Sequence, residues 1–150
     1  MNPFAATRAL LILTMLTASA CDASLGGAEA TVEADRLATN ATLRTQQGAR
    51  FTMHELQAPS GTTMREYVSP AGVVFGIAWN GPSMPDLRQL LGDHFDRYAA
   101  ALASRRTRRS PVVVELPGLV VHSSGHMRAF AGNAYLSDAL PQGVSPQDIQ

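Results

Sequence analysis

Residues 50–80 contain three short runs of strand-forming residues, separated by tight clusters rich in proline and glycine. The runs cover residues 51–56, 62–69 and 73–79, and the clusters are Pro59-Ser60-Gly61 and Pro70-Ala71-Gly72. Connections this short join antiparallel neighbours, because a parallel pair needs a crossover of a dozen or more residues. The pattern therefore predicts an antiparallel meander.

The last of these runs has large and small residues on opposite faces. In a regular strand the large face is Val73, Phe75, Ile77 and Trp79, and the small face is Val74, Gly76 and Ala78. The small face has room for a closely packed helix.

The second half of the chain predicts one helix followed by more strands. Apolar residues recur at helical spacing over about 84–103, with Ser83 as the expected N-cap. Residues 112–116, 119–121 and 127–131 predict strands, with a hairpin turn at Ser123-Ser124-Gly125. Without βαβ alternation, this order predicts an α+β fold: an antiparallel sheet of about five to six strands with one main helix (about 84–103) packed on one face.

The ends of the mature region carry weaker patterns. Residues 24–48 are small and polar, and they predict irregular structure with a short helix near 29–38. The tail from about residue 134 contains Pro141 and Pro146 and predicts loose order. We expect a single domain over residues 24–150.

The first residues have the order of a secretory signal peptide. Arg8 is their single charge, residues 9–17 are an apolar run, and Ala18-Ser19-Ala20 has the spacing of a cleavage site. The apolar run is about half the length that a membrane-spanning helix needs. We expect residues 1–20, or 1–23, to be removed on export, so that the mature protein is extracytoplasmic, in the periplasm or secreted.

Cys21 leaves the mode of release open. A lipoprotein signal places a lipidated cysteine after small residues, usually with leucine three positions before it, where this chain has Ala18. Simple cleavage is favoured over lipidation, and we expect membrane attachment only through a lipid anchor at Cys21. As the single cysteine, Cys21 forms no intrachain disulfide.

The charged residues exclude several kinds of chemistry. All twelve basic residues are arginine, which excludes lysine Schiff bases and the lysine of a phosphate-binding P-loop. The twelve acids balance them, so net charge favours neither nucleic acid nor a membrane surface as a partner. No feature indicates a cofactor.

Several short motifs together resemble a known family. They are residues 24–28 (SLGGA), 65–68 (REYV), 72–75 (GVVF), 79–82 (WNGP), 85–87 (PDL), 90–92 (LLG), 125–130 (GHMRAF) and 140–144 (LPQGV). From Ser24 onward the chain resembles an uncharacterised exported family of Gram-negative bacteria known as domain of unknown function 2844. The resemblance implies export and a single domain, and it implies no activity, substrate or catalytic residue.

His122 and His126 are the first candidate site residues, because they flank the expected hairpin turn. A three-residue loop would pair them on one face, whereas a two-residue loop would place them on opposite faces. Only the first arrangement allows a shared metal, with a third ligand such as His54 or an acid. Since a zinc site needs three or four converging ligands, we expect ordinary polar residues here and no metal site.

The remaining candidates are weak, and each has a structural alternative. Arg65 and Tyr67 form either a ligand-facing edge or a cross-strand pair, and Trp79 either meets a ligand or closes the core. Arg128, in the strand expected over residues 127–131, is another weak candidate for ligand binding. The arginine cluster is a candidate anion site or a solvated helix end: Arg105, Arg106, Arg108 and Arg109. No nucleophile motif and no acid pair indicates a catalytic residue.

These features favour a non-enzymatic binding or assembly accessory module of the cell envelope. Its expected partner is an unknown envelope protein or an anionic envelope component. Two alternatives remain: a small hydrolase or metal-dependent enzyme that uses the His122/His126 hairpin, and a secreted inhibitor or effector that offers a sheet edge or loop.

Export predicts a shortened mature chain. Mass spectrometry of the protein from the cell envelope should show that the residues before Cys21 or Ser24 are gone. If Cys21 is lipidated, Cys21→Ser should move the protein from membranes to the soluble fraction. An intact Met1 on envelope-derived protein would contradict export.

Overall fold

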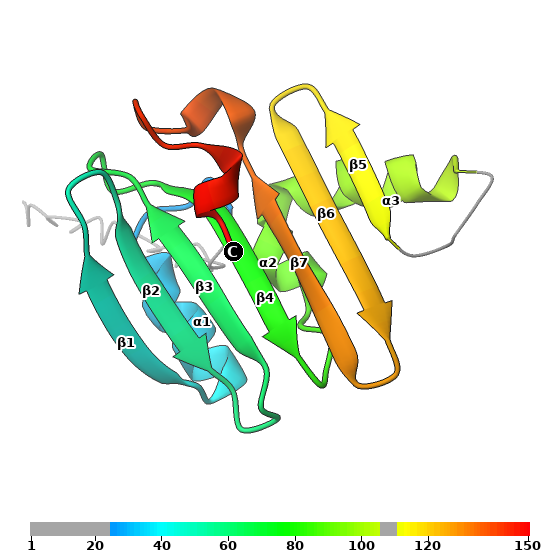
Figure 1. Ribbon diagram of the computed structural model, residues 1–150, viewed down its shortest axis with the longest axis horizontal. Helices are drawn as coiled ribbons and strands as arrows, with labels where there is room; N and C mark the ends of the chain where they lie inside the picture. The colour runs from blue at the N-terminus through cyan, green and yellow to red at the C-terminus, as the bar shows by residue number, and fades with distance from the viewer. Residues whose placement is uncertain (1–24, 106–110) are drawn as a thin grey trace, which may run out of the picture.

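The computed structural model describes residues 25–105 and 111–150, and its centre is one antiparallel sheet (Figure 1). The strand order is β1-β2-β3-β4-β7-β6-β5. The strands are β1 (Thr42–Gln47), β2 (Thr52–Gln57), β3 (Thr63–Val68), β4 (Val74–Gly81), β5 (Val112–Leu116), β6 (Leu119–His126) and β7 (Ala129–Tyr135). The α+β class is confirmed, but the sheet has seven strands within the described residues, not five to six.

The additional strand is β1. Its sequence, TLRTQQ, has no apolar alternation, and most of its residues are exposed at the edge of the sheet. It nevertheless pairs with β2 along its whole length, from Thr42 opposite Gln57 to Gln47 opposite Thr52. An edge strand with one covered side needs few apolar residues, so the hydrophobic pattern missed it.

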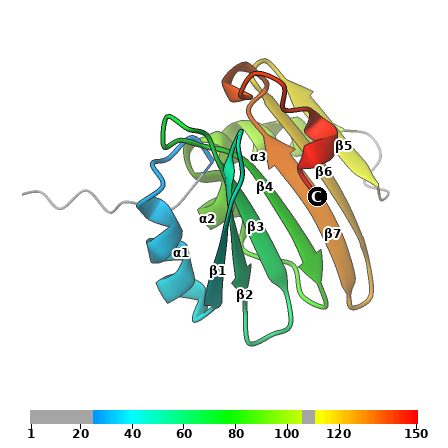
Figure 2. The same cartoon turned by 60° about the vertical axis from the view of Figure 1, so that its left-hand side comes forward.

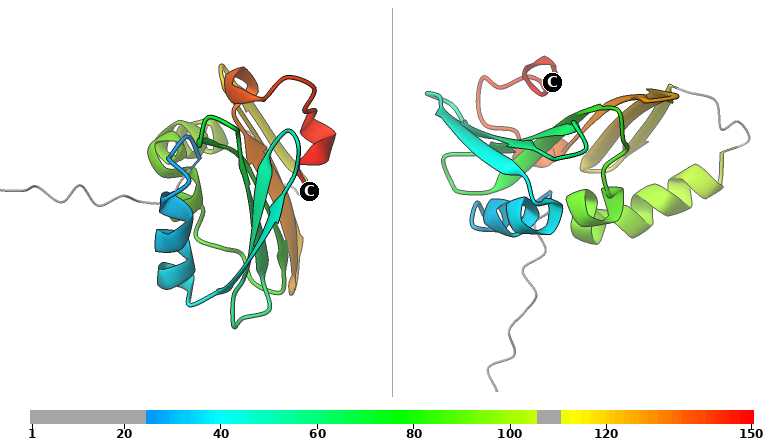
Figure 3. Two further views of the ribbon diagram at one scale, coloured as in Figure 1. Left: turned by 90° about the vertical axis from the view of Figure 1, so that its left-hand side faces the viewer. Right: turned by 90° about the horizontal axis from the view of Figure 1, so that it is seen from below.

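The helices that precede β5 cover the same face of the sheet (Figures 2 and 3). They are α1 (Thr31–Thr39), α2 (Leu87–Leu91), the short 3-10 helix η1 (Gly92–His94) and α3 (Phe95–Ala103). The short helix expected near residues 29–38 is confirmed as α1. The helix expected over 84–103 is divided at Gly92, which has a φ of 49°. It begins later than Ser83, because the Asp86 side chain accepts the N–H groups of Arg88 and Gln89.

A bulge in β4 changes which residues face the helices. Tyr67 pairs with Gly76, but the next residue, Val68, pairs with Val74, so β4 has one extra residue at this point. Phe75 therefore packs on the face opposite the helices, whereas Val74 packs in the core beneath them. The predicted large face, which grouped Phe75 with Ile77 and Trp79, was wrong at this position.

The β6–β7 hairpin also turns later than the sequence predicted. Strand β6 continues through residues 123–126, and His126 pairs with Ala129. The turn consists of Met127 and Arg128, and Arg128 has a φ of 61°. Gly125 lies within the strand, where an added Cβ would be 2.6 Å from the Phe130 ring. The glycine therefore marks an aromatic contact and not a turn.

The chain after β7 returns across the sheet face that the helices leave uncovered (Figure 3). This segment, residues 137–150, is called the strap, and the face it crosses the strap-side face. It contains the 3-10 helices η2 (Ser137–Ala139) and η3 (Pro146–Asp148). Its Ile149 is 1% exposed and packs with Tyr67, Phe75 and Ala78. This segment, which the sequence predicts to be loosely ordered, packs on the sheet through Ala139, Leu140, Val144 and Ile149.

The expected signal peptide, Cys21, Arg106, Arg108 and Arg109 lie outside the described residues. Among the helices that are described, none has the length and apolar character required to cross a bilayer.

Candidate functional site

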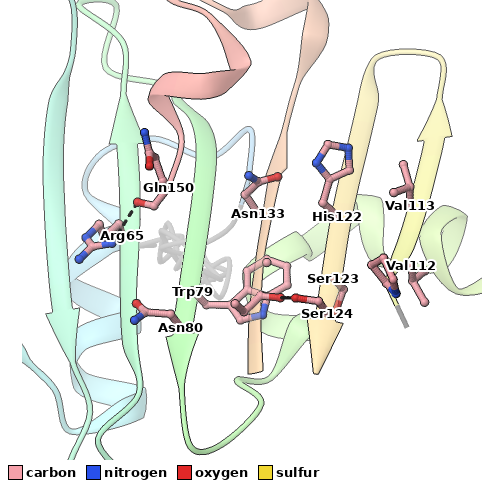
Figure 4. A pocket seen from close by; sticks show the side chains of 13 residues that line it. Arg65, Trp79, Asn80, Val112, Val113, His122, Ser123, Ser124, Asn133 and Gln150 are labelled. Carbon is pink, nitrogen blue, oxygen red and sulfur yellow. Dashed lines mark hydrogen bonds between the residues drawn. The ribbon is translucent and has the colours of Figure 1, made fainter. Parts of the chain in front are cut away.

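A groove lies on the strap-side face, beside the end of the strap (Figure 4). Its volume is about 390 Å³. Strands β3 to β7 and the strap all contribute to its lining. The polar side chains around it are Arg65, Asn80, His122, Ser123, Ser124, Asn133 and Gln150.

Strand register explains why residues from five strands lie on the same face of the sheet. Asn133 of β7 pairs with Ala78 of β4 on one side and with His122 of β6 on the other. The same row continues to Arg65 on β3 and to Val113 on β5. Directly paired residues share a face, so residues distant in sequence form one line across the sheet.

Arg65 connects the sheet to the strap. Its Nε donates to Oε2 of Glu55 at 2.9 Å, and its Nη1 donates to the carbonyl oxygen of Gln150 at 3.0 Å. The side chain of Arg65 remains about one-third exposed. The guanidinium is thus held in position at the edge of the groove by a carboxylate and a backbone carbonyl.

Only one of the two polar side-chain atoms of Asn133 has a hydrogen-bond partner in the described residues. Its Nδ2 donates to the carbonyl oxygen of Ile149 at 2.9 Å. Its buried Oδ1 has no hydrogen-bond partner within residues 25–105 and 111–150. Figure 4 shows the Asn133 side chain between Gln150 and His122. A buried acceptor without a donor costs free energy in the folded state.

Two polar side chains of the groove contact neighbouring strands. The hydroxyl of Ser124 donates to the carbonyl oxygen of Ala131 at 3.1 Å, so it is not directed at a general base. The ring of His122 makes an edge contact with Tyr135 at 6.4 Å between centroids. Across the described ranges, no group of three or more His, Cys, Asp or Glu residues could hold a metal ion.

The structure brings some of the predicted site residues together and separates others. Arg65, Trp79 and His122 all line the groove, although Trp79 is 2% exposed and its ring packs beside Gly132 in the core. Tyr67 lies next to the groove, beneath the strap.

His126 and Arg128 lie at the end of the β6–β7 hairpin, away from the groove. His126 is four residues from His122 on the same strand, which separates their Cα atoms by about 13 Å. The pairing across a three-residue loop is therefore not formed. Arg105, at the end of α3, donates to the carbonyl oxygen of Val113 on the edge strand β5.

Comparison with known proteins identifies the family of this chain. Residues 21–149 match the family described as "Protein of unknown function (DUF2844)". The chain belongs to this family. The resemblance noted in the sequence is thereby confirmed, and it extends over nearly the whole chain. No curated protein and no solved structure shows significant similarity to it.

This member of the DUF2844 family also has a polar cluster on the helix-covered face. His54 on β2 contacts Thr45 Oγ1 through Nδ1 and Glu29 Oε1 through Nε2, each at 2.9 Å. A hydroxyl, an imidazole and a carboxylate in series resemble a nucleophilic triad. Here, however, they face away from the groove, and they join β1, β2 and the segment before α1. We interpret this row of three hydrogen-bonded side chains as a structural link between these segments.

Next to His54 lies a buried pair of carboxyl groups. Glu66 of β3 pairs with His54 in the register, and it is 2% exposed. Asp35 of α1 is 1% exposed and accepts a hydrogen bond from Gln89 Nε2 of α2. Burial, together with the charge of Asp35 and a hydrogen bond with it, raises the pKa of Glu66 to about 9. Glu66 therefore keeps its proton at neutral pH.

The sequence patterns alone did not indicate this pair of carboxyl groups. A signal was present, since Glu66 interrupts a face of β3 that is otherwise Met64 and Val68. A charged residue on the apolar face of a strand indicates a buried partner, but only the fold identifies Asp35 and Gln89.

The raised pKa of Glu66 predicts that stability falls as pH rises. Between its ordinary pKa of 4.5 and about 9, the folded chain holds one more proton at this site than the unfolded chain does. One proton corresponds to a slope of about 1.4 kcal/mol per pH unit at most. Glu66→Gln should therefore make the free energy of unfolding less dependent on pH than in the wild type, as measured by urea denaturation from pH 5 to pH 9.

Glu33→Gln, on the exposed side of α1, is the matched control and should leave the dependence unchanged. A Glu66→Gln variant that keeps the full wild-type slope would show that Glu66 is ionised in the folded protein.

Proposed function

We propose that this protein is an exported binding module of the cell envelope, and that the groove on the strap-side face is its binding surface. The observation that supports this most is the groove itself, which polar side chains from β3, β4, β6 and β7 line. The order of charge, apolar run and small residues in residues 1–20 supports export.

The lining of the groove favours binding of a partner over chemistry on a substrate. Arg65 is already neutralised by Glu55, so the groove has no excess charge that would select a simple anion. Neutral hydrogen-bonding groups such as Asn80, His122 and Ser124 dominate, next to the apolar side chains of Pro111 and Val113. This mixture suits a polar ligand with apolar parts, such as a segment of an envelope protein.

The neighbouring alanines on β7 allow a controlled test of the groove. Ala131 and Ala129 are both exposed, and both face the strap side, but only Ala131 lines the groove. Ala131→Arg should fill the groove without removing an existing side-chain contact, whereas Ala129→Arg adds the same charge at the hairpin end.

Purified wild-type and variant chains would be used to capture proteins from membrane and periplasmic fractions, with quantification by mass spectrometry. We expect a partner whose recovery falls about tenfold or more with Ala131→Arg, the loss that a little over 1.4 kcal/mol of binding energy gives. Its recovery with Ala129→Arg should equal that of the wild type. Equal recovery of every bound protein by both variants would place the binding surface elsewhere.

A further inference from the structure

The turn of the β6–β7 hairpin carries two side chains that the stability of the turn does not explain. Met127 and Arg128 form this turn at one end of the sheet (Figure 1). Two-residue hairpin turns favour pairs such as Asn-Gly, because at least one of their residues has a positive φ. Here Arg128 has that conformation, with a φ of 61°, and Met127 is 97% exposed. An uncommon backbone conformation and a hydrated apolar side chain together indicate a role at the surface.

Met127 is also the most accessible methionine that the structure describes. The three others in the described residues are Met53, Met64 and Met84. Met84 is 40% exposed and Met64 is 2% exposed, whereas Met53 is half-buried in the apolar cluster around Ile149. A reagent in solution therefore reaches the sulfur of Met127 without any opening of the fold.

The Met127 thioether has two reactions open to it at the surface: it can bind a soft metal ion, and it can be oxidised. A metal site needs several converging ligands. The described residues contain no group of three or more His, Cys, Asp or Glu residues that could hold a metal ion. His126 adjoins Met127, but His122 lies about 13 Å from His126 along β6. Oxidation requires only an accessible sulfur, so it is the reaction that this turn favours.

We propose that Met127 is a site of reversible oxidation, at which a peroxide converts the thioether to a sulfoxide without disturbing the fold. The proposal goes beyond the binding function and does not depend on it, because Met127 and Arg128 do not line the groove. It assigns a modification to the one turn of the sheet whose residues do not follow the usual turn chemistry.

The reaction transfers one oxygen atom from hydrogen peroxide to the Met127 side chain. A lone pair of the Sδ atom attacks one oxygen of the peroxide, so an S–O bond forms and the O–O bond breaks. The leaving hydroxide takes the proton of the transferred oxygen and becomes water. The sulfur is thereby oxidised by two electrons, and the peroxide is reduced by two.

The fold tolerates this change at Met127 and not at Met64. Strand pairs next to the turn, beginning with His126 opposite Ala129, hold the hairpin closed independently of the Met127 side chain. Since that side chain is 97% exposed, its conversion to a polar sulfoxide removes no packing. Met64 lies in the core beneath the helices, where a sulfoxide oxygen would be taken out of water.

Repair of the sulfoxide needs two thiols, which a single chain does not contain. The sulfoxide oxygen leaves as water, while two thiols give up their hydrogens and join in a disulfide. Cys21 is the single cysteine of the chain, so the thiols come from a methionine sulfoxide reductase and its reductant. A two-residue turn with a 97% exposed side chain presents Met127 to the active site of such an enzyme.

The first test measures how fast each methionine is oxidised in the folded protein. The purified full chain is treated with hydrogen peroxide, digested with trypsin and analysed by mass spectrometry over time. Met127 and Met84 fall on separate peptides, 110–128 and 66–88, because trypsin cuts this lysine-free chain after arginine. We expect Met127 to be oxidised about twice as fast as Met84, in the ratio of their exposed fractions, and at least about tenfold faster than Met64.

Met127→Leu should remove the fastest oxygen uptake, and Met84→Leu is the matched control that should keep it. In concentrated urea, where the fold is lost, the four methionines should be oxidised at the same rate. Briefly oxidised Met84→Leu protein, in which Met127 carries the sulfoxide, should unfold at the same urea concentration as before oxidation. Oxidation of Met127 as slow as that of Met64, or a lower unfolding midpoint after it, would overturn the inference.

The second test asks whether the sulfoxide forms in cells and is repaired. Protein from the envelopes of peroxide-treated cells should carry the sulfoxide in a larger fraction at Met127 than at Met84. Methionine sulfoxide reductases, one for each sulfoxide epimer, should restore the thioether in the purified oxidised protein when dithiothreitol supplies the thiols. An unmodified Met127 in treated cells, or a sulfoxide that both enzymes leave in place, would contradict reversible oxidation.

Discussion

A central strand that is apolar on both faces requires cover on both sides of its sheet. Strand β4 is such a strand: its residues from Val74 to Trp79 are all buried, on alternate sides except at the bulge. The helices cover Ile77 and Trp79, and the strap covers Phe75 and Ala78. Exposing either pair would leave large apolar surfaces in water, at about 25 cal/mol for each Å². The two-sided burial of β4 therefore determines where every other layer of the protein lies.

The strap covers only part of its face, and this incomplete cover produces the candidate site. Gly76 and the bulge beside it create a slot for Ile149, while Tyr67 and Asn133 bind the main chain next to it. Beside Gln150, polar side chains and the apolar residues Pro111 and Val113 line the groove. On the other face, the protonated Glu66 lies beside Asp35 and so connects the sheet to α1. One face is thus closed by helices with a buried polar connection, and the other is partly closed by the strap.

Much of the fold followed from the sequence, because it depends on local patterns. The short proline- and glycine-containing turns predicted the β2–β3–β4 meander, and helical spacing predicted the layer that α2 and α3 form. Errors arose where long-range pairing overrides local pattern. The polar strand β1 is held by its pairing with β2. Gly125 makes room for the Phe130 ring and does not form a turn. The bulge in β4 moves Phe75 to the other face of the sheet. Of the candidate residues, Arg65, Trp79 and His122 line the groove, but Asn133, Ile149 and Glu66 were not predicted, since their roles depend on partners far away in the sequence.

The central claim is that Ile149 occupies the slot over Gly76 in the free protein. Nuclear Overhauser measurements on the isotope-labelled full chain observe this contact directly. The structure predicts cross-peaks from the Ile149 δ1 methyl to the Gly76 α-hydrogens and to the rings of Tyr67 and Phe75, with the methyl resonance shifted by those rings. An Ile149 methyl at its random-coil position, without cross-peaks to β4, would contradict the account.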